Sequence, residues 1–403
     1  MREKFSPLQR STLLLCFFAY ASAYTGRLNL SAALPGLRGG IAMSDTQAGL
    51  FQTVFALVYA AGQIVNGSLV DKINVRRSIA VGLVVSAACN ALFGLTASFP
   101  VMLILWGLNG AAQSMLWTPI VRMTAAWFSG KQRERASFVL SVTVIFGHLA
   151  AWALSGLLAS ALNWRFSFLA PAGVMAAVGA AALLLLRDKP STATAAREAR
   201  GRTPGVPLHR LLLETGLAAL LLCCVCNGFV RDGVVAWAPT ILALGQDGTS
   251  VSSTLLSLLI PLINLSGVLL VRRCYRLLRG GARPAVGALL LVSGAMALAL
   301  VFLNQSAAMR VTLMGLCCAA NYGLVPLINT LIPMEYEAAG RVGLVAGLAD
   351  CFIHLGSALA GVLTGALSDA AGWQGVYILW AAVSFAGALF AAASIHGGRR
   401  LQE

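Results

Sequence analysis

Long apolar stretches recur along almost the whole chain, and they constrain its fold more than any other feature. Each is long enough for a helix to cross roughly 30 Å of hydrocarbon. Hydrophobic residues make up 58% of the 403 positions and charged residues only 11%, so a soluble domain of this size is excluded. We therefore predict an all-α membrane protein with twelve transmembrane helices, at residues 11–36, 48–70, 76–97, 100–127, 134–160, 165–186, 210–243, 250–272, 282–303, 308–333, 341–369 and 374–395.

The net charge of +15 is distributed unevenly between the two sets of loops. Basic residues concentrate in both termini and in alternate loops, and the opposite loops hold only Arg38, Arg165 and Arg310. By the positive-inside rule, both termini lie in the cytoplasm, which requires an even number of crossings. We predict a multi-pass protein of a bacterial cytoplasmic membrane, whose basic residues serve topology rather than nucleic-acid binding.

A polar stretch at 187–209, rich in charge, Pro, Ser and Thr, separates two similar halves. We interpret it as a flexible cytoplasmic linker between six-helix bundles at 1–186 and 210–403. Residues recur between the halves at a near-constant offset: Arg27 and Pro35 match Arg231 and Pro239, Gly67 matches Gly267, and Gly147, Gly156 and Trp164 match Gly356, Gly365 and Trp373. Such a pseudo-symmetric repeat is the architecture of the major facilitator fold, with a substrate site near the membrane midplane.

The loop after the second span carries an acid followed by a basic cluster, in the segment GSLVDKINVRR at 67–77. Asp71 can accept hydrogen bonds from Arg76, from Arg77 or from a neighbouring helix end. We expect these residues to latch the cytoplasmic side and to act in gating. The second half has Val271 where the acid would be, so a second latch would need other groups.

Ionisable side chains inside the spans need an explanation, because each costs at least about 2.5 to 3.5 kcal/mol on insertion scales. The sequence places seven there: Arg27, Arg122, His148, Arg231, Asp232, Asp350 and His354. Arg27 and Arg231 occupy equivalent positions of the repeat and would face each other across the central cavity. A dianion between them would relieve their repulsion, and the planar guanidinium matches phosphate oxygens bidentately.

A purely structural alternative is that each arginine pairs with a nearby acid. Asp232 directly follows Arg231, but adjacent helical positions point about 100° apart and do not normally pair. We therefore favour substrate binding for both arginines. Arg122, near the cytoplasmic end of the fourth span, fits a structural or gating role better.

Four segments resemble the organophosphate:phosphate antiporters of the major facilitator superfamily, and related anion:cation symporters share much of the first. They are YTGRLNLSAALP (24–35), LWGLNGAAQSMLWTPIVRMTAAWF (105–128), FGHLAAW (146–152) and NGFVRDGVVAWAPTIL (227–242). The resemblance implies exchange of inorganic phosphate for glycerol 3-phosphate, hexose phosphates or similar esters, without a separate cofactor. It also implies that Arg27 and Arg231 bind phosphate, and that His148 and Tyr24 line the central cavity.

Two positions depart from the family pattern and leave the exact ester open. Gln63 stands where glycerol-phosphate members have a basic cavity residue on helix 2, and Pro261 falls near the acidic position of helix 8. We keep Gln63 as a candidate substrate-binding residue. Asn109, Gln113 and Trp117 are spaced by four residues and form one stripe along their helix. Trp117 can form a wall of the cavity, whereas helix packing explains Asn109.

The remaining titratable groups allow more than one interpretation. His148 can satisfy a neighbouring helix, or it can add a proton-dependent positive charge to an anion site. Asp350 and His354 lie four residues apart on one helical face, so they can pair structurally or relay protons. Asp232 has the same two options and can also orient an arginine.

Three functional hypotheses follow. The leading one is alternating-access transport of a small organic anion in exchange for phosphate. The alternatives are proton-coupled symport of a carboxylate such as a hexuronate, and a sensor that binds a sugar phosphate without moving it. An enzyme is not expected, since no nucleophile with base partners, no metal-ligand set and no phosphate-cradling glycine loop is evident. We expect one chain to be functional as a monomer, with the small anion and the lipid bilayer as its partners.

Overall fold

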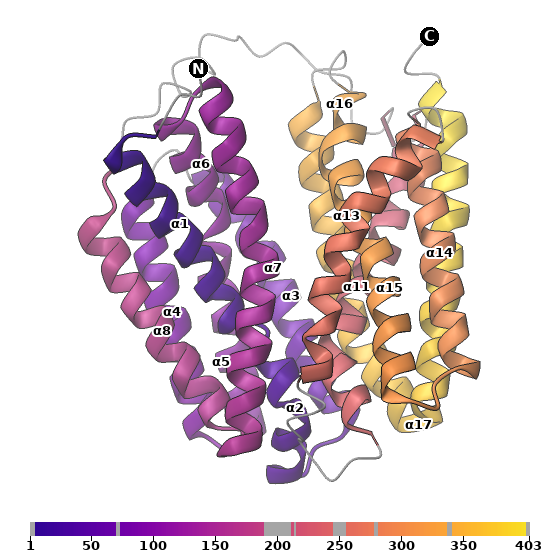
Figure 1. Cartoon of the computed structure of the whole chain (residues 1–403), viewed down its shortest axis with the longest axis horizontal. Coiled ribbons are helices and arrows are strands. Elements are labelled where there is room, and N and C mark those ends of the chain that lie inside the picture. The colour runs from indigo at the N-terminus through magenta and orange to yellow at the C-terminus, as the bar shows by residue number, and fades with distance from the viewer. Residues whose placement is uncertain are drawn as a thin grey trace. The chain divides into compact units, whose positions relative to one another are not determined.

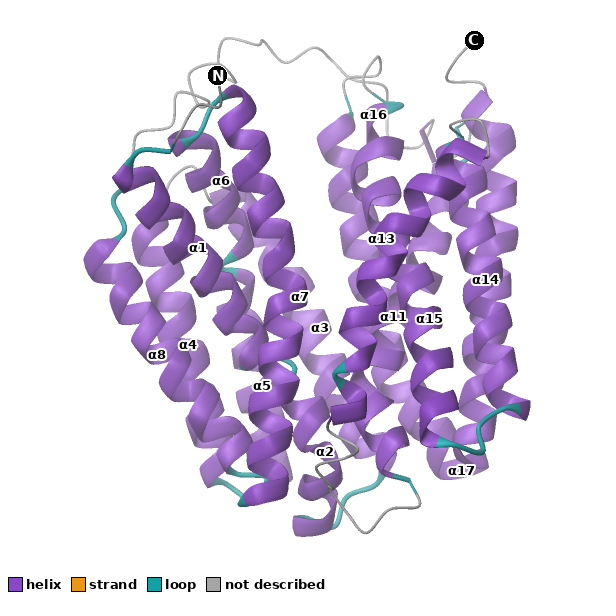
Figure 2. Cartoon of the chain, in the orientation of Figure 1, coloured by secondary structure: helices purple, strands orange, loops and turns teal. Residues whose placement is uncertain are grey.

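A computed structural model describes residues 5–69, 73–188, 211–212, 215–244, 255–277, 281–336 and 341–399. Their regular secondary structure is helical (Figure 2). The helices are α1 (Pro7–Thr25), α2 (Asn29–Gly40), α3 (Asp45–Leu69), α4 (Val75–Leu95), α5 (Phe99–Ser114), α6 (Trp117–Trp127), α7 (Gly130–Ala161), α8 (Phe166–Leu185), α11 (Leu217–Ala243), α13 (Leu259–Leu277), α14 (Ala282–Phe302), α15 (Ala307–Pro326), the π-helical η1 (Leu327–Leu331), α16 (Ile332–Met334) and α17 (Val342–Arg399). Of the predicted linker at 187–209, the structure describes only residues 187 and 188; residues 189–209 lie outside the described part.

Nine of the described helical stretches are long and apolar enough to cross a membrane. Three features reconcile this number with the twelve predicted spans. The first span is divided into α1 and α2, the apolar part of the eighth is short (Leu255–Gly267), and α17 contains the last two. Inside α17, Gly372 has φ 68°, a left-handed conformation that suits glycine, and it marks the turn between them. The predicted all-helical membrane fold is confirmed.

Chain contacts divide the helices into two compact units. The first contains α1, α2, α4 to α8 and the later part of α3, and Figure 1 shows α4 beside α8 within it. The second contains α11 to α17 together with residues 43–56, the segment that includes the first turns of α3. In the second unit, α11 and α14 pack along α17.

Equivalent glycines of the sequence repeat perform the same task in the two units. A Cβ atom on Gly147 of α7 would lie 2.6 Å from the Cβ of Tyr24 on α1. A Cβ atom on Gly356 of α17 would collide with the backbone of Val225 on α11. In each half, therefore, a glycine on the fifth helix lets it approach the first helix closely, as small residues do in membrane bundles.

The N-terminus of α3 is capped by a carboxylate from α17. Asp369 accepts hydrogen bonds from the backbone N–H groups of Asp45 (2.9 Å) and Thr46 (2.8 Å) and from the Thr46 hydroxyl (2.6 Å). Negative charge is favourable at a helix N-terminus, where backbone donors lack helical partners. One turn further on, Gly49 and Gly361 bring the two backbones into direct contact. These contacts hold the beginning of α3 within the second unit.

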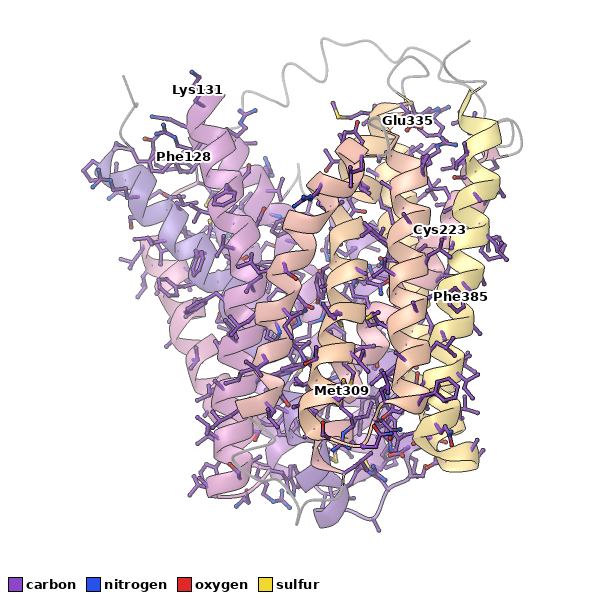
Figure 3. All side chains as sticks on the ribbon, turned by 45° about the vertical axis from the view of Figure 1, so that its right-hand side comes forward. Phe128, Lys131, Cys223, Met309, Glu335 and Phe385 are labelled. Carbon is purple, nitrogen blue, oxygen red and sulfur yellow. The ribbon has the colours of Figure 1, made fainter. Side chains whose placement is uncertain are left out.

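Arg283 is buried at the start of α14. Its Nε lies 3.0 Å from Oε2 of Glu335, and its other nitrogens donate to the Thr215 carbonyl (2.9 Å) and the Tyr336 hydroxyl (3.1 Å). Figure 3 shows Glu335 at the end of the second unit opposite Met309. Burial raises the pKa of the Glu335 carboxyl, and the neighbouring arginine opposes that shift.

Candidate functional site

The first membrane span is broken at Arg27. The helix α1 ends at Thr25 and α2 begins at Asn29, so Arg27 lies in a short non-helical segment. The expectation of one continuous helix over 11–36 is wrong at this point. The last turn of α1 is tightened instead, because the N–H groups of Gly26 and Arg27 donate to carbonyls three residues back, each at 3.2 Å.

Buried amides from two other helices bind the carbonyl groups beside the break. Asn90 of α4 and Asn109 of α5 both donate to the Gly26 carbonyl, at 3.1 and 2.8 Å. Gln113 of α5 donates to the Ala23 carbonyl at 3.1 Å. Asn109 therefore has the structural role expected of it between packed helices, and its amide also satisfies backbone that a broken membrane helix leaves without its helical partner.

The fourth span is also interrupted, between α5 and α6, and Trp117 is the first residue of α6. The Trp117 ring lies 4.7 Å from the ring of Tyr20 on α1, centroid to centroid. Tyr20 in turn lies 5.3 Å from Tyr24 in an edge-to-face arrangement. The predicted continuous helix over 100–127 is thus two helices, and the interruption places Trp117 against the aromatic residues that precede Arg27.

The Arg27 guanidinium lies against two tyrosine rings. Its central carbon is 4.9 Å from the ring centroid of Tyr59 on α3 and 6.0 Å from that of Tyr24. Both distances are within the range of cation–π attraction. The Tyr59 hydroxyl accepts a hydrogen bond from Gln63 Nε2 (2.8 Å), and Gln63 Oε1 accepts one from the Thr118 hydroxyl (3.2 Å). The polar chain from Thr118 to Tyr59 therefore fixes the ring beneath the cation.

His148 completes this cluster from α7. Its ring lies 5.4 Å from the ring of Tyr24 and 6.1 Å from that of Trp152. Nδ1 is 3.1 Å from the Val144 carbonyl, a hydrogen bond that requires the proton on Nδ1. The imidazole is buried, and it lies on the same tyrosine, Tyr24, as the Arg27 guanidinium.

The first unit thus brings together five of the predicted substrate-binding residues, Tyr24, Arg27, Gln63, Trp117 and His148. Three further residues in the cluster were not predicted, namely Tyr20, Tyr59 and Thr118. Helical spacing would have indicated two of them: Tyr20 precedes Tyr24 by four residues, and Tyr59 precedes Gln63 by four.

Arg231 of α11 has different surroundings in the second unit. Its Nε and Nη2 lie 2.7 and 2.9 Å from the two carboxylate oxygens of Asp232, a bidentate ion pair with both side chains mostly buried. The expectation that these neighbours do not pair is wrong. The arginine side chain is long enough to fold back and meet the short aspartate side-on, and a low dielectric favours that pairing. The Tyr322 ring centroid lies 5.6 Å from the guanidinium carbon.

Asp350 and His354 share one face of α17, as their spacing predicted. His354 Nδ1 lies 2.9 Å from the Asp350 carbonyl and 3.7 Å from its carboxylate oxygen Oδ2. The backbone contact is the hydrogen bond, and the carboxylate is within ion-pair distance only. The Asp350 side chain is 44% exposed, so this pair is more open than Arg231 and Asp232.

The proposed cytoplasmic latch can be followed only in part, because Asp71 lies outside the described residues. The backbone N–H of Arg76 donates to Asp188 (3.1 Å), and that of Arg77 donates to Asn74 (2.9 Å) at the start of α4. Arg122 donates to the Ile73 carbonyl (3.3 Å). The last contact joins α6 to the loop before α4, in agreement with a structural role for Arg122.

Comparison with known proteins finds curated relatives with related names. The chain is 26% identical to the "Glycerol-3-phosphate transporter" of Bacillus subtilis (strain 168), over 100% of this chain and 96% of that protein. It is 27% identical to a "Probable hexose phosphate transport protein" of Chlamydia muridarum, over 44% of this chain and 39% of the relative. It is 30% identical to the "Membrane sensor protein UhpC" of Escherichia coli (strain K12), over 31% of this chain and 28% of that protein.

Solved structures and a family model agree on the fold. A bacterial homologue of the human lysosomal transporter Spinster superposes with a TM-score of 0.78 at 18% identity, covering 98% of each chain. The model of the Major Facilitator Superfamily matches residues 16–349. The homologues are transport proteins of this fold, not enzymes. The chain belongs to the major facilitator superfamily.

Proposed function

We propose that this multi-pass protein exchanges a small phosphate ester for inorganic phosphate by alternating access across a bacterial cytoplasmic membrane, with both termini in the cytoplasm. The observation that carries the proposal is the placement of Arg27 in a helix break, among tyrosines, Gln63 and His148. Relatives named as glycerol-3-phosphate and hexose phosphate transporters, one of them aligned along the whole chain, support a phosphate ester as the cargo.

Arg27 suits an anion by its chemistry and by its position. A guanidinium inside a membrane span is costly, and its fork matches phosphate oxygens bidentately in a low dielectric. Arg27 also lies two residues before the start of α2 at Asn29, and the N-terminal end of that helix carries positive partial charge. In transporters, broken helices present such ends to anionic substrate groups. The break therefore supports direct contact of Arg27 with the cargo.

The neighbours of Arg27 would adjust the site for a phosphate ester. Tyr24 and Tyr59 hold the cation through their ring faces. His148 would add positive charge when protonated. Gln63 carries no charge and binds the Tyr59 hydroxyl, so it would contribute polarity and position rather than electrostatic attraction.

Arg231 is the second proposed phosphate ligand, and its ion pair with Asp232 limits how it can bind an anion. The carboxylate engages the Nε and Nη2 edge of the guanidinium. Cargo would then bind through the Nη1 and Nη2 edge, or it would replace Asp232. In either case the Asp232 carboxylate weakens the attraction of Arg231 for an anion.

Phosphate counterflow in proteoliposomes tests the proposal. Vesicles loaded with unlabelled phosphate should accumulate labelled phosphate, and glycerol 3-phosphate or a hexose phosphate should compete better than a hexuronate. Arg27→Ala should lower the exchange by about a hundredfold or more. Arg165→Ala is a matched control, because Arg165 donates to the Gly94 carbonyl (2.7 Å) and stacks on Trp164 (4.6 Å). Unaltered exchange by Arg27→Ala would refute the site.

Proton-coupled symport of a carboxylate is a second candidate, and the Asp350–His354 pair is the observation that favours it. Uptake of a labelled hexuronate driven by a pH gradient, and abolished by Asp350→Asn, would support this function. Uptake driven by internal phosphate and insensitive to the pH gradient would reject it.

A sensor function is a third candidate, favoured by the partial similarity to UhpC. A sensor would bind a sugar phosphate without moving it. A ligand-dependent thermal shift in a protein that shows no counterflow would support sensing, whereas counterflow of the same ligand would reject it.

A further inference from the structure

We propose that Asn90 and Asn109 are positioning residues that set the affinity of Arg27 for its anion without touching the anion. The inference rests on the proposed function and deepens it. Both amides bind the carbonyl of Gly26, the residue immediately before Arg27, and they come from two different helices. The backbone at the break is therefore held from two sides.

The orientation of both amides is fixed by further hydrogen bonds. The Ser86 hydroxyl donates to Asn109 Oδ1 (2.5 Å), which leaves Asn109 Nδ2 directed at Gly26. Asn29, the first residue of α2, donates to Asn90 Oδ1 (2.8 Å). The group thus connects the end of α1, the start of α2 and two supporting helices. Ser86, Asn90, Asn109 and Asn29 are all fully buried.

The physical consequence concerns where Arg27 points. Membrane helices satisfy their own backbone, so the broken form requires other donors for the carbonyls at the break. Without the two amides, the Gly26 carbonyl would regain a partner most readily by helix formation across residues 26–28. Successive residues of a helix turn by about 100°, so even a partial repair would move the guanidinium away from Tyr59.

The second unit supplies a matched control. There, Asn227 of α11 donates to Asn321 Oδ1 (3.0 Å) and to its carbonyl, and Asn321 donates to the Ser293 hydroxyl (2.7 Å). Asn227 and Asn321 are as deeply buried as the first group. Because α11 runs without a break through Arg231, loss of this network should lower stability without changing the backbone conformation at Arg231.

The test compares Asn90→Leu and Asn109→Leu with Asn321→Leu, a substitution of the same size and polarity change. Thermal stability without phosphate measures the structural cost, and phosphate counterflow gives KM and the maximal rate. We expect KM to rise roughly tenfold in the first two variants, the size of a lost buried hydrogen bond, and to stay within about twofold in Asn321→Leu. Ser86→Ala, which removes one hydroxyl, should fold even if the leucine variants do not, and it should raise KM to a lesser extent.

A double-mutant cycle separates positioning from a general structural effect. In an Arg27→Lys background, Asn109→Leu should add little further loss of affinity, because the group that it positions has already changed. Equal KM increases in Asn109→Leu and Asn321→Leu would overturn the positioning role, and so would KM effects of Asn109→Leu and Arg27→Lys that are fully additive. Phosphate exchange by the wild-type protein would still support the proposed function in that case. A wild-type protein with neither phosphate exchange nor a phosphate-dependent thermal shift would overturn both.

Discussion

Arg27 and Arg231 occupy equivalent positions of the sequence repeat, yet their surroundings differ in three respects. Arg27 lies in a helix break and contacts two tyrosine rings, whereas Arg231 lies in a continuous helix and is bound side-on by Asp232. The backbone before Arg27 is held by amides from other helices, whereas Asn227 and Asn321 of the second unit bind one another. The repeat has therefore kept two cations and given them different electrostatic environments.

This difference implies a division of labour that substitutions can test. If Arg27 is the principal anion ligand and Arg231 a regulated one, loss of Arg27 should affect transport most. Loss of Arg231 should affect stability as well as transport, because it leaves a carboxylate behind.

The largest effect is expected at Arg27. Arg27→Ala should lower kcat/KM for phosphate exchange by about a hundredfold or more, since two charge-assisted hydrogen bonds would be lost. Arg27→Lys should retain part of the activity, because a point charge replaces the bidentate fork. Counterflow at a series of phosphate concentrations measures kcat/KM for both variants. A larger loss in Arg231→Ala than in Arg27→Ala would reverse the proposed order of the two residues.

Arg231→Leu should destabilise the protein by roughly 3 kcal/mol or more, because it leaves Asp232 buried without its partner cation. The double variant Arg231→Leu/Asp232→Leu should regain most of that stability but not the exchange activity. Thermal denaturation in detergent, combined with counterflow, measures the two properties separately. If the double variant is no more stable than the single one, the ion pair is not the reason for the loss.

Arg283→Leu should lower stability by a comparable amount, since the partly buried Glu335 carboxylate would lose the cation that compensates for its burial. Because this pair lies away from both proposed phosphate ligands in the sequence and uses different partners, KM for phosphate should remain within about twofold of wild type. Arg283→Leu is thus the control for a destabilising loss of an arginine. A large rise in KM would connect this pair to the transport site.

The tyrosine rings should produce smaller effects of unequal size. Tyr59→Leu removes the ring face beneath Arg27 and should raise KM about tenfold at most, given the strength of cation–π contacts. Tyr59→Phe keeps the ring and should cost less. Tyr322→Leu beside Arg231 should change KM by less than about threefold, because Asp232 already holds that guanidinium. Equal effects of Tyr59→Leu and Tyr322→Leu would contradict the contrast between the two sites.

The smallest effect is expected at Asp350. Asp350→Asn removes a half-exposed carboxylate whose histidine partner also bonds to the backbone, so phosphate exchange should change by less than about threefold. The dependence of uptake on an imposed pH gradient gives an independent readout. Abolished uptake together with a lost pH dependence would instead establish this pair as a proton relay.

Much of the fold was predictable because the hydrocarbon core dictates helix length and apolar composition locally. The spans, the two-fold repeat and the intramembrane arginines all follow from residues read along the chain. The site was predictable only in part. Tyr24 and His148 came from motif resemblance, Gln63 from a departure from the family pattern and Trp117 from its helical spacing, and the structure brought them together. Tyr59 carried no signal beyond helical spacing, and Thr118 carried none.

The two errors have different physical origins. Whether a helix continues through residues 26–28 depends on donors that lie more than sixty residues away in the sequence, at Asn90 and Asn109. Whether Arg231 meets Asp232 depends on how a long side chain folds inside a packed unit, which average helical geometry does not determine. In the first case contacts from distant helices outweighed a local rule, and in the second the conformation of one long side chain did.

The sequence by itself determined that this is a membrane protein of repeated apolar helices with basic residues placed inside it, because burial in lipid acts on each segment separately. Only the tertiary structure decided which backbone breaks, that Asp232 pairs with Arg231 and which rings lie against Arg27. The break and the Tyr59 ring depend on groups from distant segments, which become neighbours only when the helices pack. The Arg231–Asp232 pair joins adjacent residues and depends on the side-chain conformation that the packed unit imposes.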